Sequence, residues 1–258
     1  SGAVGTTLFG YLAGANIVSG AINNTYIGYG VGDATHTNAA DDNVGVGYNA
    51  LTALTTANGN VAVGSNAGLA ISTGTYNTVI GFGALDEGST QVSNNVAIGK
   101  GTMGGSIGTE AVIDCVAVGY TALSGALEEE ASGTIAIGKS ALAALTTGAG
   151  NIGIGYQSLL THTTGGQNIA IGYGAMNDTD AGSTSLASDH NIFIGTDSGG
   201  GTWADALSEY NVAIGNYTMS GAMNGALNNT GVGYNALSAL TSGDGNTSMG
   251  YNSGDTIT

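Results

Sequence analysis

The stretch Asn60–Gly68, which reads NVAVGSNAG, is one copy of a unit that recurs along the whole chain. It returns as NTVIGFGAL at residues 77–85 and as NIAIGYGAM at residues 168–176. Aligned on the central glycine, the unit occurs fourteen times at intervals of 17 to 23 residues. A repeat this short, with strand-like cores, is typical of a solenoid in which each repeat forms one coil. We therefore predict an all-β fold, a β-roll or β-solenoid of about 14 coils, as a single domain over residues 1–258. The central glycines are Gly10, Gly28, Gly47, Gly64, Gly81, Gly99, Gly119, Gly138, Gly155, Gly172, Gly195, Gly215, Gly233 and Gly250.

The three residues before each glycine alternate in size. The residue directly before it is always apolar and the residue three before it is always β-branched, as in Val63 and Val61. Side chains two apart in a strand point to the same face, so we expect these two columns to form the inward-facing core. The residue between them should then point outward. It is usually small, and such a face allows another backbone to approach closely; examples are Ala62, Ala97, Ala117, Ala136, Ala170 and Ala213.

Two further columns predict how a coil closes. The central glycine should turn a corner that requires positive φ or the absence of Cβ. Four residues before it, eleven of the fourteen repeats carry Asn, and the exceptions are Thr6, Cys115 and Thr134. Identical amides stacked at strand spacing can hydrogen-bond to one another, so we predict an asparagine ladder along the coils. Further apolar residues after the glycine, such as Leu54 and Leu145, should complete the core from a second strand on the opposite side of the coil.

Composition narrows the function classes. The chain has 48 Gly, no Pro, only 8% charged residues and a formal net charge of −16, with Lys100 and Lys139 its only basic residues. This balance argues against nucleic acid and anionic membranes as partners. The sequence contains no run of about 18 apolar residues, so no membrane span is predicted. The absence of a starting Met and of a signal-peptide pattern suggests a processed chain or an excised fragment.

The linkers between repeats vary in length. Longer loops are expected at residues 100–115, 177–190 and 199–210, and the last holds the sole Trp203. Acidic residues lie mostly in the linkers, where a solvated rim is the simpler interpretation and calcium bound between neighbouring loops is the alternative. No other cofactor is expected. Cys115 has no disulfide partner within the chain and should pack as a small buried side chain. His36, His162 and His190 lie in separate linkers without a nucleophile motif, so we do not expect an enzyme.

Aromatic residues follow the central glycine in most repeats. A column of rings could stabilise the coil corners, contact another subunit or bind carbohydrate, because Tyr offers a large apolar area with a polar tip. Tyr210 and Trp203 in the 199–210 loop are further candidates for ligand or partner contact. The column consists of Tyr11, Tyr29, Tyr48, Phe82, Tyr120, Tyr156, Tyr173, Tyr234 and Tyr251.

The best-conforming repeats are NVAIG at residues 95–99, TIAIG at 134–138 and NVAIG at 211–215. They resemble the head repeats of YadA-like trimeric autotransporter adhesins, a repeat type that also occurs in phage tail fibres. The resemblance implies a left-handed β-roll, three copies of which pack side by side into a homotrimer. On that resemblance, the column of small residues from Ala62 to Ala213 is our candidate for the trimer contact.

The expected function is therefore a structural and adhesive fibre module, on an extracellular or virion surface, that displays loops for attachment to a cell-surface glycan or protein receptor. Two alternatives stay open. One is a self-assembling extracellular filament of subunits stacked head to tail. The other is a lectin-like module that binds glycans through the aromatic column or the Trp203 loop.

Overall fold

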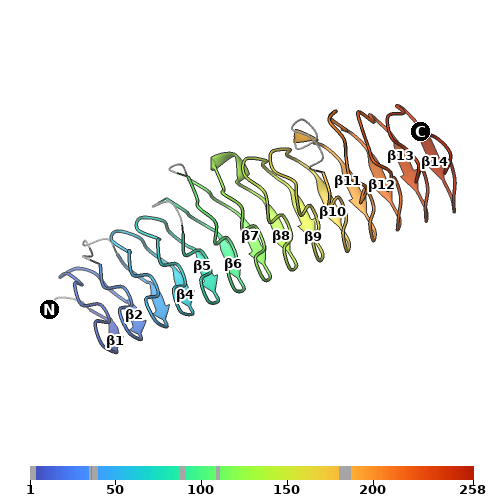
Figure 1. The fold of residues 1–258 in the computed structure, drawn as a ribbon. Coiled ribbons are helices and arrows are strands. Elements are labelled where there is room, and N and C mark those ends of the chain that lie inside the picture. The colour runs from blue at the N-terminus through green and yellow to red at the C-terminus, as the bar shows by residue number, and fades with distance from the viewer. Residues whose placement is uncertain (1–3, 35, 37–39, 88–90, 109–110, 180–186) are drawn as a thin grey trace. The chain divides into compact units, whose positions relative to one another are not determined.

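The computed structural model describes the chain except for residues 1–3, 35, 37–39, 88–90, 109–110 and 180–186. The chain divides into two compact units, Ser1–Ser132 and Gly133–Thr258. Each unit carries seven three-residue strands, which Figure 1 shows as short arrows on successive coils. The first unit contains β1 (Thr7–Phe9), β2 (Thr25–Ile27), β3 (Val44–Val46), β4 (Val61–Val63), β5 (Thr78–Ile80), β6 (Val96–Ile98), β7 (Val116–Val118) and the short 3₁₀ helix η1 (Glu129–Ala131). The second contains β8 (Ile135–Ile137), β9 (Ile152–Ile154), β10 (Ile169–Ile171), β11 (Ile192–Ile194), β12 (Val212–Ile214), β13 (Thr230–Val232) and β14 (Thr247–Met249).

Within each unit, neighbouring strands pair in parallel and in register with the repeat. Between β4 and β5, for example, Val61 pairs with Thr78, Ala62 with Val79 and Val63 with Ile80. The same repeat positions therefore stack directly on one another from coil to coil. This arrangement confirms the predicted β-solenoid, with each repeat forming one coil, and shows that its strands are parallel.

The predicted direction of the strand side chains is wrong. The middle residue of each strand points inward, whereas its two neighbours are half-buried or exposed, and only the terminal strand β1 departs from this pattern. The small residues proposed as the trimer contact are 0% exposed, so they form the core of the coil and offer no surface to another chain. These residues are Ala62, Ala97, Ala117, Ala136, Ala170 and Ala213.

The narrow interior of the coil explains this reversal. The opposite side of the coil contributes a second buried residue, four positions after the central glycine, such as Leu51, Met103 or Leu142. Only a small strand residue fits opposite these long side chains, because protein interiors are close-packed. A Cβ added to the strand residue Gly45 would lie 3.6 Å from Cδ1 of Leu51, which places the two positions in contact.

Where the inward strand residue is large, its opposite residue is glycine. Phe193 and Tyr26 are both fully buried, and the residues four positions after their central glycines are Gly199 and Gly32. A Cβ at Gly199 would lie 2.6 Å from Cδ1 of Phe193, and one at Gly32 would lie 2.7 Å from the ring of Tyr26. In most coils the two columns thus compensate for each other in volume; in the coil of Ala62 and Gly68 the side chains of Ile71 and Leu51 fill the space instead.

The corners of the coil agree with expectation, whereas its far side differs. The central glycines adopt positive φ, as predicted; Gly81 has φ of 140°, and a Cβ there would collide with the carbonyl oxygen of Gly99 on the next coil. The far side is not a second strand in the described residues. It is built of turns in which Leu51 and Leu85 adopt positive φ of 53° and 48° while their side chains remain in the core.

The predicted asparagine ladder is confirmed. The Asn77 side chain donates from Nδ2 to Oδ1 of Asn60 at 2.9 Å and to the carbonyl of Val92 at 2.8 Å. Its own Oδ1 accepts the backbone N–H of Asn95 at 3.1 Å. Each amide therefore joins its own coil to the preceding coil and to the segment that leads into the strand of the following coil. The same pattern joins Asn24, Asn43, Asn60, Asn77 and Asn95 in the first unit, and Asn151, Asn168, Asn191, Asn211, Asn229 and Asn246 in the second.

Asn77→Ala is expected to destabilise the fold by roughly 3 kcal/mol, because it leaves the Val92 carbonyl and donors of Asn95 buried without partners. The measurement is the free energy of unfolding in urea. Asn246→Ala is the matched control: Asn246 is only partly buried and ends the ladder, so its loss should cost about 1 kcal/mol. Equal costs at the two positions would contradict this account of the ladder.

Volume compensation predicts a rescue at Phe193 and Gly199. Phe193→Ala should cost about 3–5 kcal/mol through the cavity it leaves, and Gly199→Met about 1–3 kcal/mol through overpacking. The double variant recreates the Ala–Met pairing of the adjacent coils, Ala170 with Met176 and Ala213 with Met219. Its loss of stability should therefore be smaller than the sum of the single losses by about 1–2 kcal/mol. Strict additivity in the same urea titrations would rule out contact between the two positions.

Candidate functional site: an aromatic column beside an apolar sheet face

The aromatic residues after the central glycines form an exposed column of stacked rings. Ring centroids are 5.4 Å apart between Tyr11 and Tyr29 and again between Tyr29 and Tyr48, with interplanar angles of 28° and 15°. In the second unit, Tyr156 and Tyr173 stack at 5.2 Å and 8°. The ring faces thus cover one another and leave mainly edges to solvent. This geometry favours the role of stabilising the coil corners over a flat platform for sugar rings.

Both basic residues of the chain stand in this column. Lys100 follows the central glycine Gly99, and its Nζ lies 5.8 Å from the ring centroid of Phe82 and 5.8 Å from that of Tyr120. Lys139 follows Gly138, and its Nζ lies 5.5 Å from the ring of Tyr156. These distances are those of cation–π interactions. The column therefore accepts an ammonium group at a position where a ring would otherwise stack.

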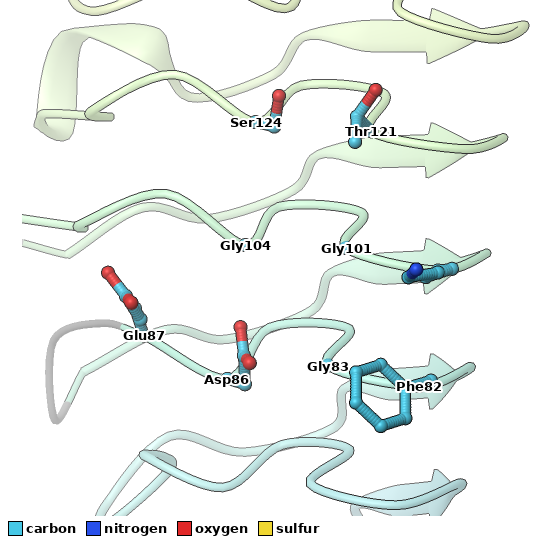
Figure 2. A pocket seen from close by; sticks show the side chains of 9 residues that line it. Phe82, Gly83, Asp86, Glu87, Gly101, Gly104, Thr121 and Ser124 are labelled. Carbon is cyan, nitrogen blue, oxygen red and sulfur yellow. The ribbon is translucent and has the colours of Figure 1, made fainter.

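A shallow depression of about 280 Å³ adjoins the Phe82–Lys100 part of the column. Figure 2 shows three successive loops, with Phe82 at one end and the carboxylates of Asp86 and Glu87 further along the same loop. Burial raises the pKa of Asp86, and the charge of Glu87 adds to this shift. The depression thus combines an acidic rim with aromatic and cationic groups. It is lined by Phe82, Gly83, Asp86, Glu87, Lys100, Gly101, Gly104, Thr121 and Ser124.

The outward face of the strands is apolar in both units. Ile27, Ile80 and Ile214 expose between 38% and 41% of their surface, although they lie in the middle of regular coils. No residue of the fourteen strands is charged. The two outward columns, the residues one and three before each central glycine, therefore form an uncharged sheet face. Contiguous exposed apolar surfaces of this kind mark sites of association.

The two candidate residues of the 199–210 loop differ in position. Trp203 is fully buried: its ring packs against Phe193 at 5.7 Å and its Nε1 donates to the Gly199 carbonyl at 2.9 Å. The prediction that Trp203 contacts a ligand from an exposed loop is therefore wrong. Tyr210 is 52% exposed and stacks on His190 at 5.1 Å. The column residues Tyr48, Tyr120, Tyr156, Tyr173 and Tyr234 are between 37% and 56% exposed, as a contact role requires.

His162 is a buried polar residue whose environment the sequence did not indicate. Its Nε2 lies 2.9 Å from the Gly165 carbonyl and its Nδ1 lies 3.2 Å from the hydroxyl of Thr179. A carbonyl oxygen only accepts, so Nε2 donates in the contact with Gly165, and Nδ2 of Asn168 also lies 3.2 Å from Nε2. Burial lowers the pKa of His162 to about 4. Cys115 is also buried, as predicted.

The described part of the chain contains neither a cluster of metal ligands nor a membrane-spanning helix. No three His, Cys, Asp or Glu side chains gather there as a metal site, and calcium binding stays a prediction. No helix among the described residues is long and apolar enough to cross a membrane. No family model, curated protein or solved structure matches the chain.

Stability should fall in acid because of His162. The folded state holds its pKa at about 4, below the unfolded value of 6.5, so unfolded chains bind more protons between these values. The contribution is complete above pH 6.5 and is lost as pH falls towards 4, by roughly 3 kcal/mol. Urea unfolding across this pH range should show a shallower loss for His162→Gln than for the wild-type chain. His190→Gln removes an exposed histidine and is the control; a slope reduced equally by both substitutions would contradict the assignment.

Proposed function

We propose that the protein is a structural fibre module that assembles by side-by-side packing of identical chains through the apolar sheet face. The observation that carries the proposal is the pair of outward columns, apolar or threonine in almost every coil and free of charge. This face replaces the column of small residues as the contact surface. The resemblance to YadA-like head repeats supports a homotrimer, in which three sheet faces would meet around a common axis.

A second copy of the chain suits this face better than an unrelated partner. Within a unit, the outward residues repeat at the strand spacing of about 4.8 Å. A second copy has the same period, so its ridges meet the grooves of the first along every coil instead of at one point. Each coil then adds the same small apolar contact, and the total grows with the number of coils. A partner without this period would lose register after a few coils.

The function that follows is mechanical and adhesive rather than catalytic. Repeated coils provide stiffness, and the longer linkers, at residues 100–115, 177–190 and 199–210, are the places where attachment loops could vary without disturbing the strands. An extracellular or virion surface, with a cell-surface glycan or protein as receptor, is the setting that the resemblance supports. The head-to-tail filament and the lectin-like module stay predictions.

Adjacent residues of β5 allow a sharp test. Ile80 points outward and is 38% exposed, whereas Val79 points inward and is fully buried. Val63→Asp combined with Ile80→Asp should dissociate the assembly into monomers of 25.0 kDa while the β-sheet circular dichroism is retained. The reason is that association would bury carboxylates without partners. Analytical ultracentrifugation gives the masses.

The control is Val79→Asp, which places a carboxylate inside the coil and should unfold it locally at a cost of several kcal/mol. A wild-type chain that sediments as a stable monomer at all concentrations would overturn the proposed assembly. So would a Val63→Asp/Ile80→Asp variant that keeps the wild-type mass.

A further inference from the structure

The aromatic column of the first unit has one gap. Ser65 follows the central glycine Gly64, between the coils that carry Tyr48 and Phe82. Tyr48 stacks on Tyr29 on its other side, and Phe82 has Lys100 on its other side. Tyr48 and Phe82 make no ring contact with each other, so at Ser65 the column lacks a side chain that would bridge these two rings. We call this place the Ser65 gap.

The spacing of the Ser65 gap is that of a site which the chain itself fills. Phe82 and Tyr120 are also two coils apart, and between them stands Lys100, with Nζ 5.8 Å from both ring centroids. Strand spacing places rings two coils apart at about 10 Å, which is too far for stacking but suits a ring–cation–ring sandwich. The Ser65 gap repeats this geometry with a short side chain in place of lysine.

The exposure of the rings agrees with an unfilled position. Tyr29, which is stacked on both sides, is 47% exposed, whereas Tyr48 and Phe82 are 52% and 58% exposed. Ser65 itself is only half-buried. The two rings that border the gap are therefore accessible from solvent.

The charge of the surroundings favours a cation over an anion or a neutral ring. The chain has a formal net charge of −16, and Asp86 and Glu87 lie in the loop that follows Phe82. The negative faces of the two rings add to this attraction. Lys100 lies one coil after Phe82, and the bound cation would lie one coil before it. Phe82 would therefore stand between two positive charges.

We propose that the Ser65 gap binds a primary alkylammonium group, the side chain of a lysine from a partner protein, between the rings of Tyr48 and Phe82. Lys100 is the internal precedent for this ligand: a primary ammonium on a flexible apolar stem. The stem can lie along the column while the charged end reaches the two ring faces. This site is independent of the sheet face and of the assembly proposed above.

The second unit does not repeat the site. Its column is interrupted at two successive coils, by Thr196 and Asn216, between Tyr173 and Tyr234. Tyr217 packs edge-on against Tyr234 at 5.6 Å and covers part of that interruption. The rings there stand three coils apart, which is too wide for one ammonium group to contact both.

The chain has only three phenylalanines, which makes the test simple. Fluorophenylalanine labelling of the full chain should give one ¹⁹F signal each from Phe9, Phe82 and Phe193. Titration with N-acetyl-lysine N-methylamide should shift the Phe82 signal in a saturable way. Phe193 is buried and Phe9 lies on the sheet face, so their signals should not move. The neutral analogue N-acetyl-norleucine N-methylamide should leave all three signals unchanged.

Two substitutions separate this site from general attraction to a negative surface. Ser65→Lys fills the gap from within and should abolish the Phe82 shift caused by the added lysine derivative. Lys100→Ser, the matched control, leaves the Ser65 gap intact and opens a second gap beside Phe82, so the shift should persist or grow. Both positions lie on the surface, and an unchanged Phe193 signal in each variant would report an intact core.

The proposal is overturned if the lysine derivative does not shift Phe82, if the norleucine derivative shifts it equally, or if Ser65→Lys binds like the wild-type chain. None of these results bears on side-by-side assembly, which is measured by mass. Conversely, a monomeric wild-type chain that shows the selective shift would refute the assembly and leave this site standing.

Discussion

The narrow interior of the coil is the constraint on which the rest of this structure depends. In each coil the inward strand residue lies opposite the residue four after the central glycine, and further buried side chains such as Leu54, Ile71 and Leu145 fill the space beside them. Close packing therefore limits how large the two opposed residues can be together. Leucine or methionine on the turn side therefore faces alanine or glycine in most coils, with Val79 opposite Leu85 as the exception, and Phe193 faces Gly199. The apolar residues on either side of the inward strand position have no space inside the coil. They point outward, and an uncharged apolar sheet face is the consequence.

The asparagine ladder solves a second problem of the same narrow coil. Backbone groups at the start of each strand are buried and need hydrogen-bond partners. One amide supplies both an acceptor for the next coil and a donor for a carbonyl of the segment between coils. At Cys115 the backbone N–H still donates to Asn95 at 2.9 Å, but the thiol replaces the amide donor only with sulfur contacts of 3.5 and 3.6 Å. At Thr134 the hydroxyl lies 3.4 Å from the Gly148 carbonyl. The amide-to-amide bond of the ladder is therefore replaced by weaker contacts at these two coils.

The sequence was sufficient for the repeat, the glycine corners and the asparagine ladder, because each depends on one residue type at one position. It was insufficient for the direction of the strand side chains, since an apolar–small–apolar pattern has period two whichever face is buried. A usable signal existed in the size compensation between the strand residue and the residue four after the glycine, as at Tyr26 with Gly32. The burial of Trp203 could not be predicted in this way. It depends on the loop folding back so that Nε1 reaches the Gly199 carbonyl, a contact without a repeat pattern.

The sheet face and the aromatic column share one electrostatic property, the absence of carboxylates. No strand residue and no position of the aromatic column is a carboxylate, so the acidic residues that the structure describes lie on the remaining sides of the coils. The two lysines, in contrast, both stand in the column, directly beside the sheet face. Chains with a net charge of −16 repel one another, and the repulsion falls as their carboxylates are kept apart. Contact through the sheet faces keeps them apart, whereas contact through the turns would bring them together. Electrostatics and apolar burial thus favour the same orientation of neighbouring chains.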